Sequence, residues 1–234
     1  MSRLIENEIK ELRGKVLDMA ELVLLQLDNV TIAISTRDYK LAMKVRRNEQ
    51  FIDNYDTNID ERCESILALH QPVANDLRFV FSVLKINAYL EQIGDIINGI
   101  ARKMFDIRLE FSPELLERLQ LARMMELTRG ILTQSLMAFF KEQIEQARDV
   151  FERDDAIDEI HRSAFDIIVE RIQEHPEKAG EYMQLHLIIK SLEKIADFAV
   201  CIAEEGLFHL EGKVYKHSAL KFAYKNNDGA AQTA

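Results

Sequence analysis

Hydrophobic residues recur at steps of three and four along nearly the whole chain, which is the period of an amphipathic helix. Two stretches show the continuous apolar seam of a helix that packs along its length on near-parallel neighbours. The first consists of Val83, Ile86, Leu90, Ile93, Ile97, Ile100 and Met104, and the second of Leu185, Ile188, Leu192, Ile195, Ala199 and Ile202. The pattern therefore predicts long helices packed side by side.

Five interruptions divide this pattern, near residues 35–38, 70–72, 107–113, 140–142 and 174–180. We expect six long antiparallel helices, at about 3–34, 38–69, 72–106, 113–139, 142–174 and 179–211, and a poorly ordered polar tail at 213–234. The 234 residues include only 8 Gly and 3 Pro, so the turns that an all-β fold requires are missing. The fold class that we predict is all-α.

The two halves of the chain resemble each other. At an offset of 105 residues, Ile52, Asp53 and His70 correspond to Ile157, Asp158 and His175. At an offset of 102 residues, Glu91 and Asp95 correspond to Glu193 and Asp197. Apolar matches between helices can arise by chance, but matched Glu, Asp and His residues favour a duplication. We predict two tandem three-helix bundles, at residues 1–109 and 110–212.

Composition narrows the possible partners and the compartment. The net charge is −10, which argues against nucleic acid as a direct partner, because such proteins cluster Lys and Arg against phosphate. Cys63 and Cys201 lie far apart in the sequence among apolar residues, which favours free thiols in a reducing compartment. The N-terminus lacks the apolar core of a signal peptide and no apolar run approaches a membrane span. We expect a cytoplasmic protein without direct membrane insertion.

Four acidic pairs spaced by four residues stand at duplicated positions. They are Glu49 with Asp53, Glu91 with Asp95, Asp154 with Asp158, and Glu193 with Asp197. Like charges at this helical spacing are unfavourable by a few tenths of a kcal/mol, so a bound cation is one explanation for all four. Carboxylates suit hard cations such as iron in its harder states, manganese, magnesium or calcium. The alternative is an ordinary solvated acidic face.

A ferritin-like di-iron enzyme also places carboxylates in a helical bundle. Such a site uses Glu-x-x-His on two helices. The nearest spacing in this chain is Asp158 to His161, and the other half has no counterpart. A metal-dependent oxidase or metal-storage bundle is therefore the weaker interpretation.

Three segments together resemble the signature of the PhoU family. Residues 70–78 read HQPVANDLR, residues 90–95 read LEQIGD, and residues 192–204 read LEKIADFAVCIAE. The resemblance extends over about residues 3–212. Gln92, Lys194, Phe198 and Cys201 depart from the residues that are usual in the family, and the second half has no counterpart of the segment from Asp76 to Arg78.

The resemblance implies a non-enzymatic regulator of phosphate uptake and phosphate-starvation signalling. Its implied partners are the ATPase subunit of a phosphate ABC transporter and a phosphate-sensing histidine kinase, and it implies a homodimer. The acidic pairs carry over as ligands of a multinuclear iron or zinc site, and manganese or magnesium stays open on ligand chemistry. The alternative within this class is an accessory of a different phosphate permease.

The same resemblance makes Gln71, Asp76 and Arg78 candidate partner-binding residues. Arg78, Ser82 and Lys85 form a stripe on one helix, and the forked guanidinium of Arg78 is suited to clamp a carboxylate or phosphate of a partner. The competing interpretation is an internal salt bridge from Arg78 to Asp76 or to a neighbouring helix.

Overall fold

The computed structural model describes residues 2–106 and 111–215, and these residues form helices with no strand. The helices are α1 (Ser2–Thr36), α2 (Tyr39–His70), α3 (Ala74–Asp106), α4 (Pro113–Arg118), α5 (Leu121–Lys141), α6 (Ile144–Glu174) and α7 (Ala179–Glu211), with a 3₁₀ turn, η1 (Pro176–Lys178), between α6 and α7. The prediction of an all-α fold is confirmed. None of the described helices has a stretch apolar and long enough to cross a bilayer.

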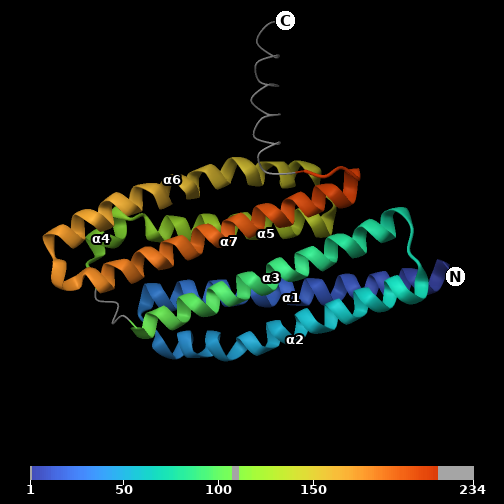
Figure 1. The fold of residues 1–234 in the computed structure, drawn as a ribbon, viewed down its shortest axis with the longest axis horizontal. Helices are drawn as coiled ribbons and strands as arrows, with labels where there is room; N and C mark the ends of the chain where they lie inside the picture. The colour runs from blue at the N-terminus through green and yellow to red at the C-terminus, as the bar shows by residue number, and fades with distance from the viewer. Residues whose placement is uncertain (1, 107–110, 216–234) are drawn as a thin grey trace, which may run out of the picture.

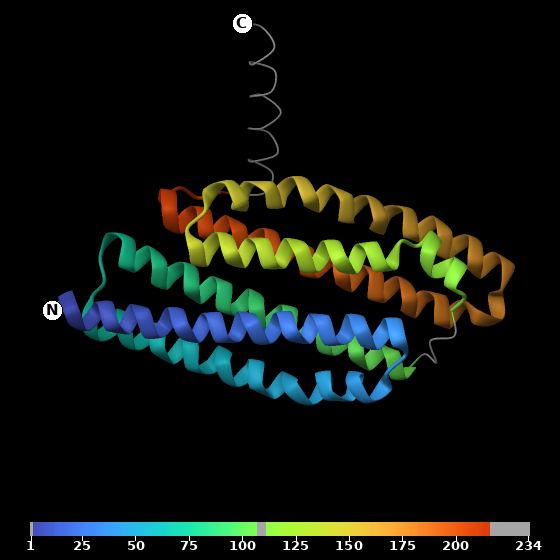
Figure 2. The ribbon, with the colours of Figure 1, turned by 180° about the vertical axis from the view of Figure 1, so that it is seen from behind.

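The helices form two antiparallel three-helix units, α1–α3 and α5–α7, with α4 beside α5 (Figures 1 and 2). Short capped connections set the antiparallel order. Asp38 accepts hydrogen bonds from the backbone amides of Lys40 and Leu41 at 2.9 and 3.0 Å, which starts α2. Gln71 ends α2 in the left-handed conformation. Residues 107–110 of the predicted break at 107–113, and residues 216–234 of the predicted tail at 213–234, lie outside the described residues.

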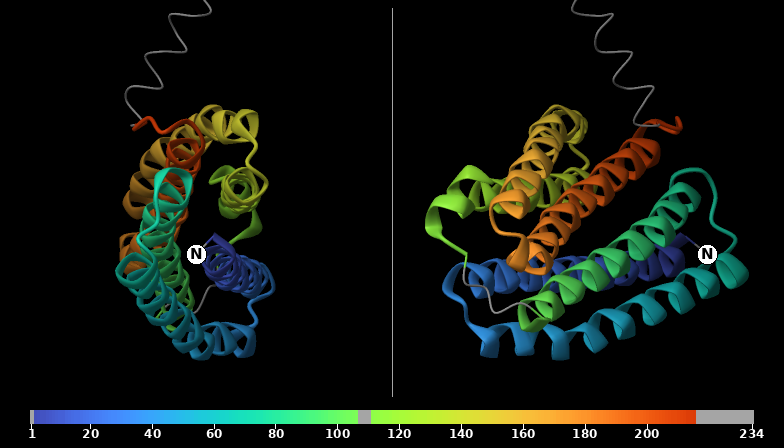
Figure 3. Two further views of the ribbon diagram at one scale, coloured as in Figure 1. Left: turned by 90° about the vertical axis from the view of Figure 1, so that its right-hand side faces the viewer. Right: turned by 60° about the vertical axis from the view of Figure 1, so that its left-hand side comes forward.

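The core follows the two seams, whose residues are all buried. Helices α3 and α7 also run alongside each other and join the two units (Figure 3). Phe79 of α3 stacks on Phe139 of α5 with 5.7 Å between ring centroids, and His209 of α7 meets the edge of Phe79 at 5.5 Å. The guanidinium of Arg13 lies 4.8 Å from the centroid of Phe79. An aromatic cluster thus locks one end of the interface.

The helix expected at 113–139 is interrupted, which differs from the prediction. Gln120 has a φ of 49° and separates α4 from α5. Leu115, Leu119 and Leu121 are all buried. The step from Leu119 to Leu121 is too short for one straight helix to turn both toward the same core. The left-handed residue resolves this conflict by turning the chain between them.

Candidate metal and partner sites

The acidic pairs of the first half meet where α2 and α3 pack tightly against each other. Ile52 lies inside the pair Glu49 and Asp53, and Gly94 lies inside the pair Glu91 and Asp95. A Cβ atom at Gly94 would come within 2.9 Å of the Ile52 Cδ1. The absence of a side chain at this glycine therefore lets the two backbones approach and brings the two pairs together.

The electrostatics of Glu49 show how closely these groups interact. Burial raises its pKa most, followed by a hydrogen bond with Asp95 and by the charges of Asp95 and Asp53. The Asn98 amide opposes this shift by donating to the Glu49 Oε2. The same cleft, about 350 Å³ in volume, is also lined by Arg46 and Arg102. The ionised form of Glu49 is thus disfavoured when the site holds no cation.

Asp56 is a member of this cluster that the sequence reasoning missed. The pKa of Glu91 is raised first by burial, then by Asp95 and next by Asp56. The buried Asn87 amide holds Asp56 in place, because its Nδ2 donates to the Asp56 Oδ1 at 2.8 Å. The available signal was its position three residues after Asp53, on the same face of α2.

The second half brings Asp158 of α6 together with Glu193 and Asp197 of α7, but with compensating positive charge. Burial raises the pKa of Glu193, as does Asp197, whereas His161 lowers it, Asp158 raises it and Lys194 lowers it. The His161 Nδ1 lies 3.8 Å from the Glu193 Oε1, and the Lys194 Nζ lies 3.1 Å from the Asp197 Oδ2. Glu193 therefore has an imidazole beside it, and Asp197 has the cationic side chain of Lys194.

His161 occupies the position that corresponds to Asp56, since the two residues are 105 positions apart in the sequence. The ring of His161 stacks on that of His186, with 5.7 Å between centroids. Asp154 differs from its counterpart Glu49 in being only 3% exposed. The first cluster therefore offers only oxygen ligands, while the second adds imidazole nitrogens.

The carboxylates are chemically suitable ligands for a hard cation, but their side chains are not arranged around a single ion. The carboxylates of each half lie near one another and raise each other's pKa, as a site that receives positive charge should. Among the described residues, however, no three His, Cys, Asp or Glu side chains are arranged as ligands of one ion. The exposed Asp53 and Asp95 side chains would have to turn to coordinate a metal.

The candidate partner residues separate into two groups. Gln71 is exposed and Asp76 is half-buried at the start of α3. Arg78 instead contacts α7: its Nε donates to the His209 carbonyl oxygen at 3.2 Å, and its guanidinium also bonds Asn75. The described residues include no ion pair between Arg78 and Asp76.

The rest of the stripe also faces α7. Ser82 is buried and its Oγ donates to the Glu205 carbonyl oxygen at 3.2 Å. The Lys85 Nζ lies 2.9 Å from the Glu205 Oε1. The stripe of Arg78, Ser82 and Lys85 therefore joins the two halves of the molecule. Arg78 contacts a neighbouring helix through a backbone carbonyl oxygen rather than through the expected salt bridge, and its role in binding a partner stays a prediction.

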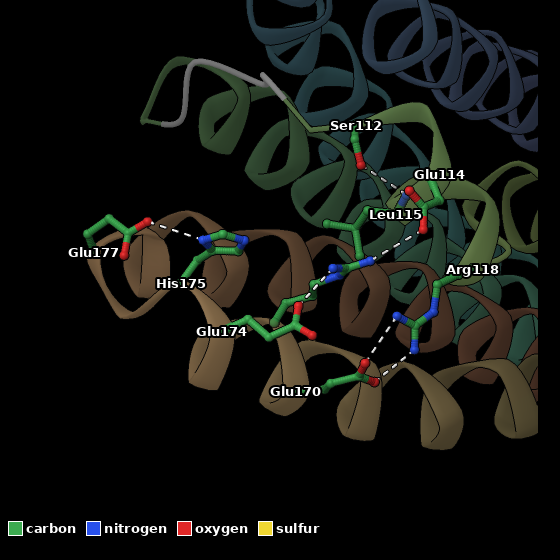
Figure 4. A network of polar contacts seen from close by, with 9 residues as sticks. Ser112, Glu114, Leu115, Arg118, Glu170, Glu174, His175 and Glu177 are labelled. Atoms are coloured by element: carbon green, nitrogen blue, oxygen red, sulfur yellow. Dashed lines mark hydrogen bonds and ion pairs between the residues drawn. The ribbon is translucent and has the colours of Figure 1, made fainter.

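The connection between α6 and α7 lies at the opposite end of the molecule and is closed by ion pairs (Figure 4). Arg171 pairs with Glu174 at 2.8 Å, and Arg118 of α4 pairs with Glu170 at 2.8 Å. This end is polar and internally paired, which distinguishes it from the loop between α2 and α3.

The fold and the site define a class of all-α protein. It consists of two tandem three-helix units that carry acidic pairs at matched positions. Comparison with family models identifies the member: the PhoU domain matches residues 16–104 and 121–206. The chain belongs to the PhoU family, as its sequence signature predicted.

Relatives and solved structures agree. A phosphate-specific transport system accessory protein PhoU homolog from Aquifex aeolicus is 30% identical, over 92% of this chain and 96% of that protein. Homologs of the same description from Pseudomonas putida (94% of this chain, 86% of that protein) and Thermotoga maritima (90% of each) are both 31% identical. The crystal structure of PhoU from Pseudomonas aeruginosa is similar to this structure, with a TM-score of 0.84 at 29% identity. The similarity covers 89% of this chain and 99% of the Pseudomonas aeruginosa chain.

Proposed function

We propose that this chain is a non-enzymatic accessory protein of phosphate transport. It acts in the cytoplasm as an adaptor between the ATPase subunit of a phosphate ABC transporter and a phosphate-sensing histidine kinase, and it represses the starvation response when phosphate is plentiful. The observation that carries the proposal is the PhoU match in both halves, together with relatives described as accessory proteins of phosphate-specific transport.

A binding experiment tests the adaptor role. The full chain is immobilised and presented with the purified ATPase subunit and with the cytoplasmic part of the kinase, separately and together. Retention of both proteins is the expected result. Retention of neither would overturn the adaptor role, and retention of a different phosphate permease alone would assign the chain to that permease.

We further propose that cations bind at the acidic pairs of both halves, Glu49, Asp53, Glu91 and Asp95 in the first and Asp154, Asp158, Glu193 and Asp197 in the second. The raised pKa values of Glu49, Glu91 and Glu193 support this, because a bound cation would relieve their mutual repulsion. Iron, zinc, manganese and magnesium are the candidates, and the role of the ion is charge neutralisation that draws neighbouring helices together.

Metal analysis of protein purified without chelator tests this proposal. We expect bound metal in the wild type and a reduced content in the Glu91→Ala, Asp95→Ala double variant. The matched control replaces Glu61 and Glu64, two exposed carboxylates of α2 outside the cluster. Metal-free wild-type protein, or equal losses in both variants, would reject the proposal. Sedimentation of the same samples tests the homodimer that the family resemblance implies.

A further inference from the structure

An apolar groove opens at the end of the first unit, between the first turns of α1 and the loop that joins α2 to α3. Figure 1 shows the N-terminus beside this loop. The groove has a volume of about 570 Å³. Leu4, Leu69 and Val73 line it and are 60%, 74% and 74% exposed. Three large apolar side chains thus gather in water around one concave surface, which is typical of an interaction site.

The backbone of the loop holds this arrangement under strain. Gln71 and Ala74 have φ angles of 45° and 47°, which place two residues with side chains in the left-handed region. Such residues cost on the order of 1–3 kcal/mol each, and they collect at binding and switching sites. Pro72 between them is buried, while Val73 is 74% exposed. The fold accepts strain here and leaves an apolar side chain exposed.

Within the segment from Gln71 to Arg78, Arg78 contacts α7, whereas Asp76 lines the groove. Arg78 is engaged on the His209 carbonyl oxygen at the end of α7. Asp76 lines the groove on the other side and is half-buried there. The opposite end of the molecule also has a pocket, of about 200 Å³, but its apolar lining residues Phe111, Leu115 and Tyr182 are buried. Among the described residues, the loop between α2 and α3 therefore combines exposed apolar side chains with a carboxylate, and the corresponding loop between α6 and α7 does not.

We propose that this groove, defined by Leu4, Leu69, Val73 and Asp76, docks a short segment of a protein partner. The segment buries two or three apolar side chains in the groove and places a Lys or Arg beside Asp76. Charge decides the class of occupant, because Glu6 and Asp76 both line the groove. Their carboxylates repel anionic lipid headgroups, and two copies meeting groove to groove would bring them against those of the other copy. The proposal rests on the adaptor function above and assigns that function a surface.

Binding of the full chain to the purified ATPase subunit and to the cytoplasmic part of the kinase, measured by calorimetry, tests the groove. In the Leu69→Ser, Val73→Ser double variant, we expect the affinity for at least one partner to fall about tenfold or more, because the contact loses apolar burial. In Asp76→Asn, we expect a smaller loss of a few-fold and a weaker dependence on salt. The control is Leu25→Ser, which changes a leucine that is 52% exposed outside the groove.

The outcomes separate failure of the groove assignment from failure of the adaptor role. If the wild type binds a partner and the double variant binds it equally well, the groove is not the docking surface and the adaptor role stands. If the wild type binds neither partner, the adaptor role fails and the groove assignment fails with it.

If the double variant is monomeric where the wild type is a dimer, the occupant is a second copy. If a chain ending at Tyr215 binds the partners more tightly than the full chain, its own tail competes for the groove. These last two results overturn a partner segment as the resident occupant. Circular dichroism verifies that each variant is folded.

Discussion

Replacement of Glu49 by Gln is the sharpest test of the carboxylate cluster. Glutamine has nearly the same shape and keeps an oxygen that accepts the hydrogen bond from the Asn98 amide. It removes the negative charge beside Asp95 and Asp53, the two neighbours that raise the pKa of Glu49. The substitution therefore leaves the packing in place and removes the charge, and with it both the cost of burying a carboxylate and the repulsion from its neighbours. We expect the Glu49→Gln variant to be more stable than the wild type when metal is removed.

The size of the effect follows from the number of neighbours. A like-charge contact at helical spacing costs a few tenths of a kcal/mol. Because Glu49 has one such neighbour on α2 and one across on α3, relief of both should stabilise the fold by about 0.5–1 kcal/mol. A protein of this size shifts its Tm by roughly 2–4 °C per kcal/mol, so we expect an increase of about 1–4 °C.

The sign of the pH dependence follows from linkage. The folded state raises the pKa of Glu49 above its ordinary value of 4.5. Below that value the side chain is neutral in both the folded and the unfolded state, so the substitution has little effect. As pH rises through the raised pKa, the wild type loses stability that the variant keeps. The advantage of the variant should therefore be absent in acid and complete at neutral pH.

Thermal unfolding followed by circular dichroism measures this difference in chelator, between about pH 4 and about pH 8. The control is Glu61→Gln, an exposed carboxylate on the same helix. On addition of manganese we expect the wild-type Tm to rise more than that of Glu49→Gln. A variant that is less stable than the wild type at neutral pH in chelator would refute the reasoning, because Glu49 would then make net favourable contacts.

Three further variants test the contacts between the halves and the second cluster. Phe79→Ala should destabilise the fold by about 3–5 kcal/mol in urea titrations. The control Phe81→Ala changes a residue that is 47% exposed on the same helix and should cost about 0.5 kcal/mol or less. Equal losses of stability in the two variants would contradict the packing of Phe79 between the halves. Lys85→Met should lower the stability of the fold by about 1–3 kcal/mol, because it leaves the buried Glu205 carboxylate without its Lys85 partner. Adding Glu205→Gln to the Lys85→Met variant should recover much of this stability. His161→Asp should lower metal-free stability and raise manganese affinity in calorimetry, since it restores an all-oxygen site; unchanged affinity would exclude His161 from the site.

Much of the acidic cluster was accessible to sequence reasoning, because helical spacing is a local property. A spacing of four positions between carboxylates places them on one face, and the duplication indicated which helices would carry them. Asp56 and His161 were harder to assign. Their participation depends on how closely α2 approaches α3 and α6 approaches α7, and in the first half that approach depends on a glycine against Ile52.

The sequence by itself determined the long helices, the duplicated plan and the family, since hydrophobic periodicity and short signatures are encoded along the chain. Only the tertiary structure decided which face of each helix meets the other half. It turned Arg78 toward the end of α7, paired Lys85 with Glu205 across 120 positions, and left Leu69 and Val73 exposed. The physical reason is that a side chain's neighbours from distant segments are set by packing between helices, which no local pattern specifies.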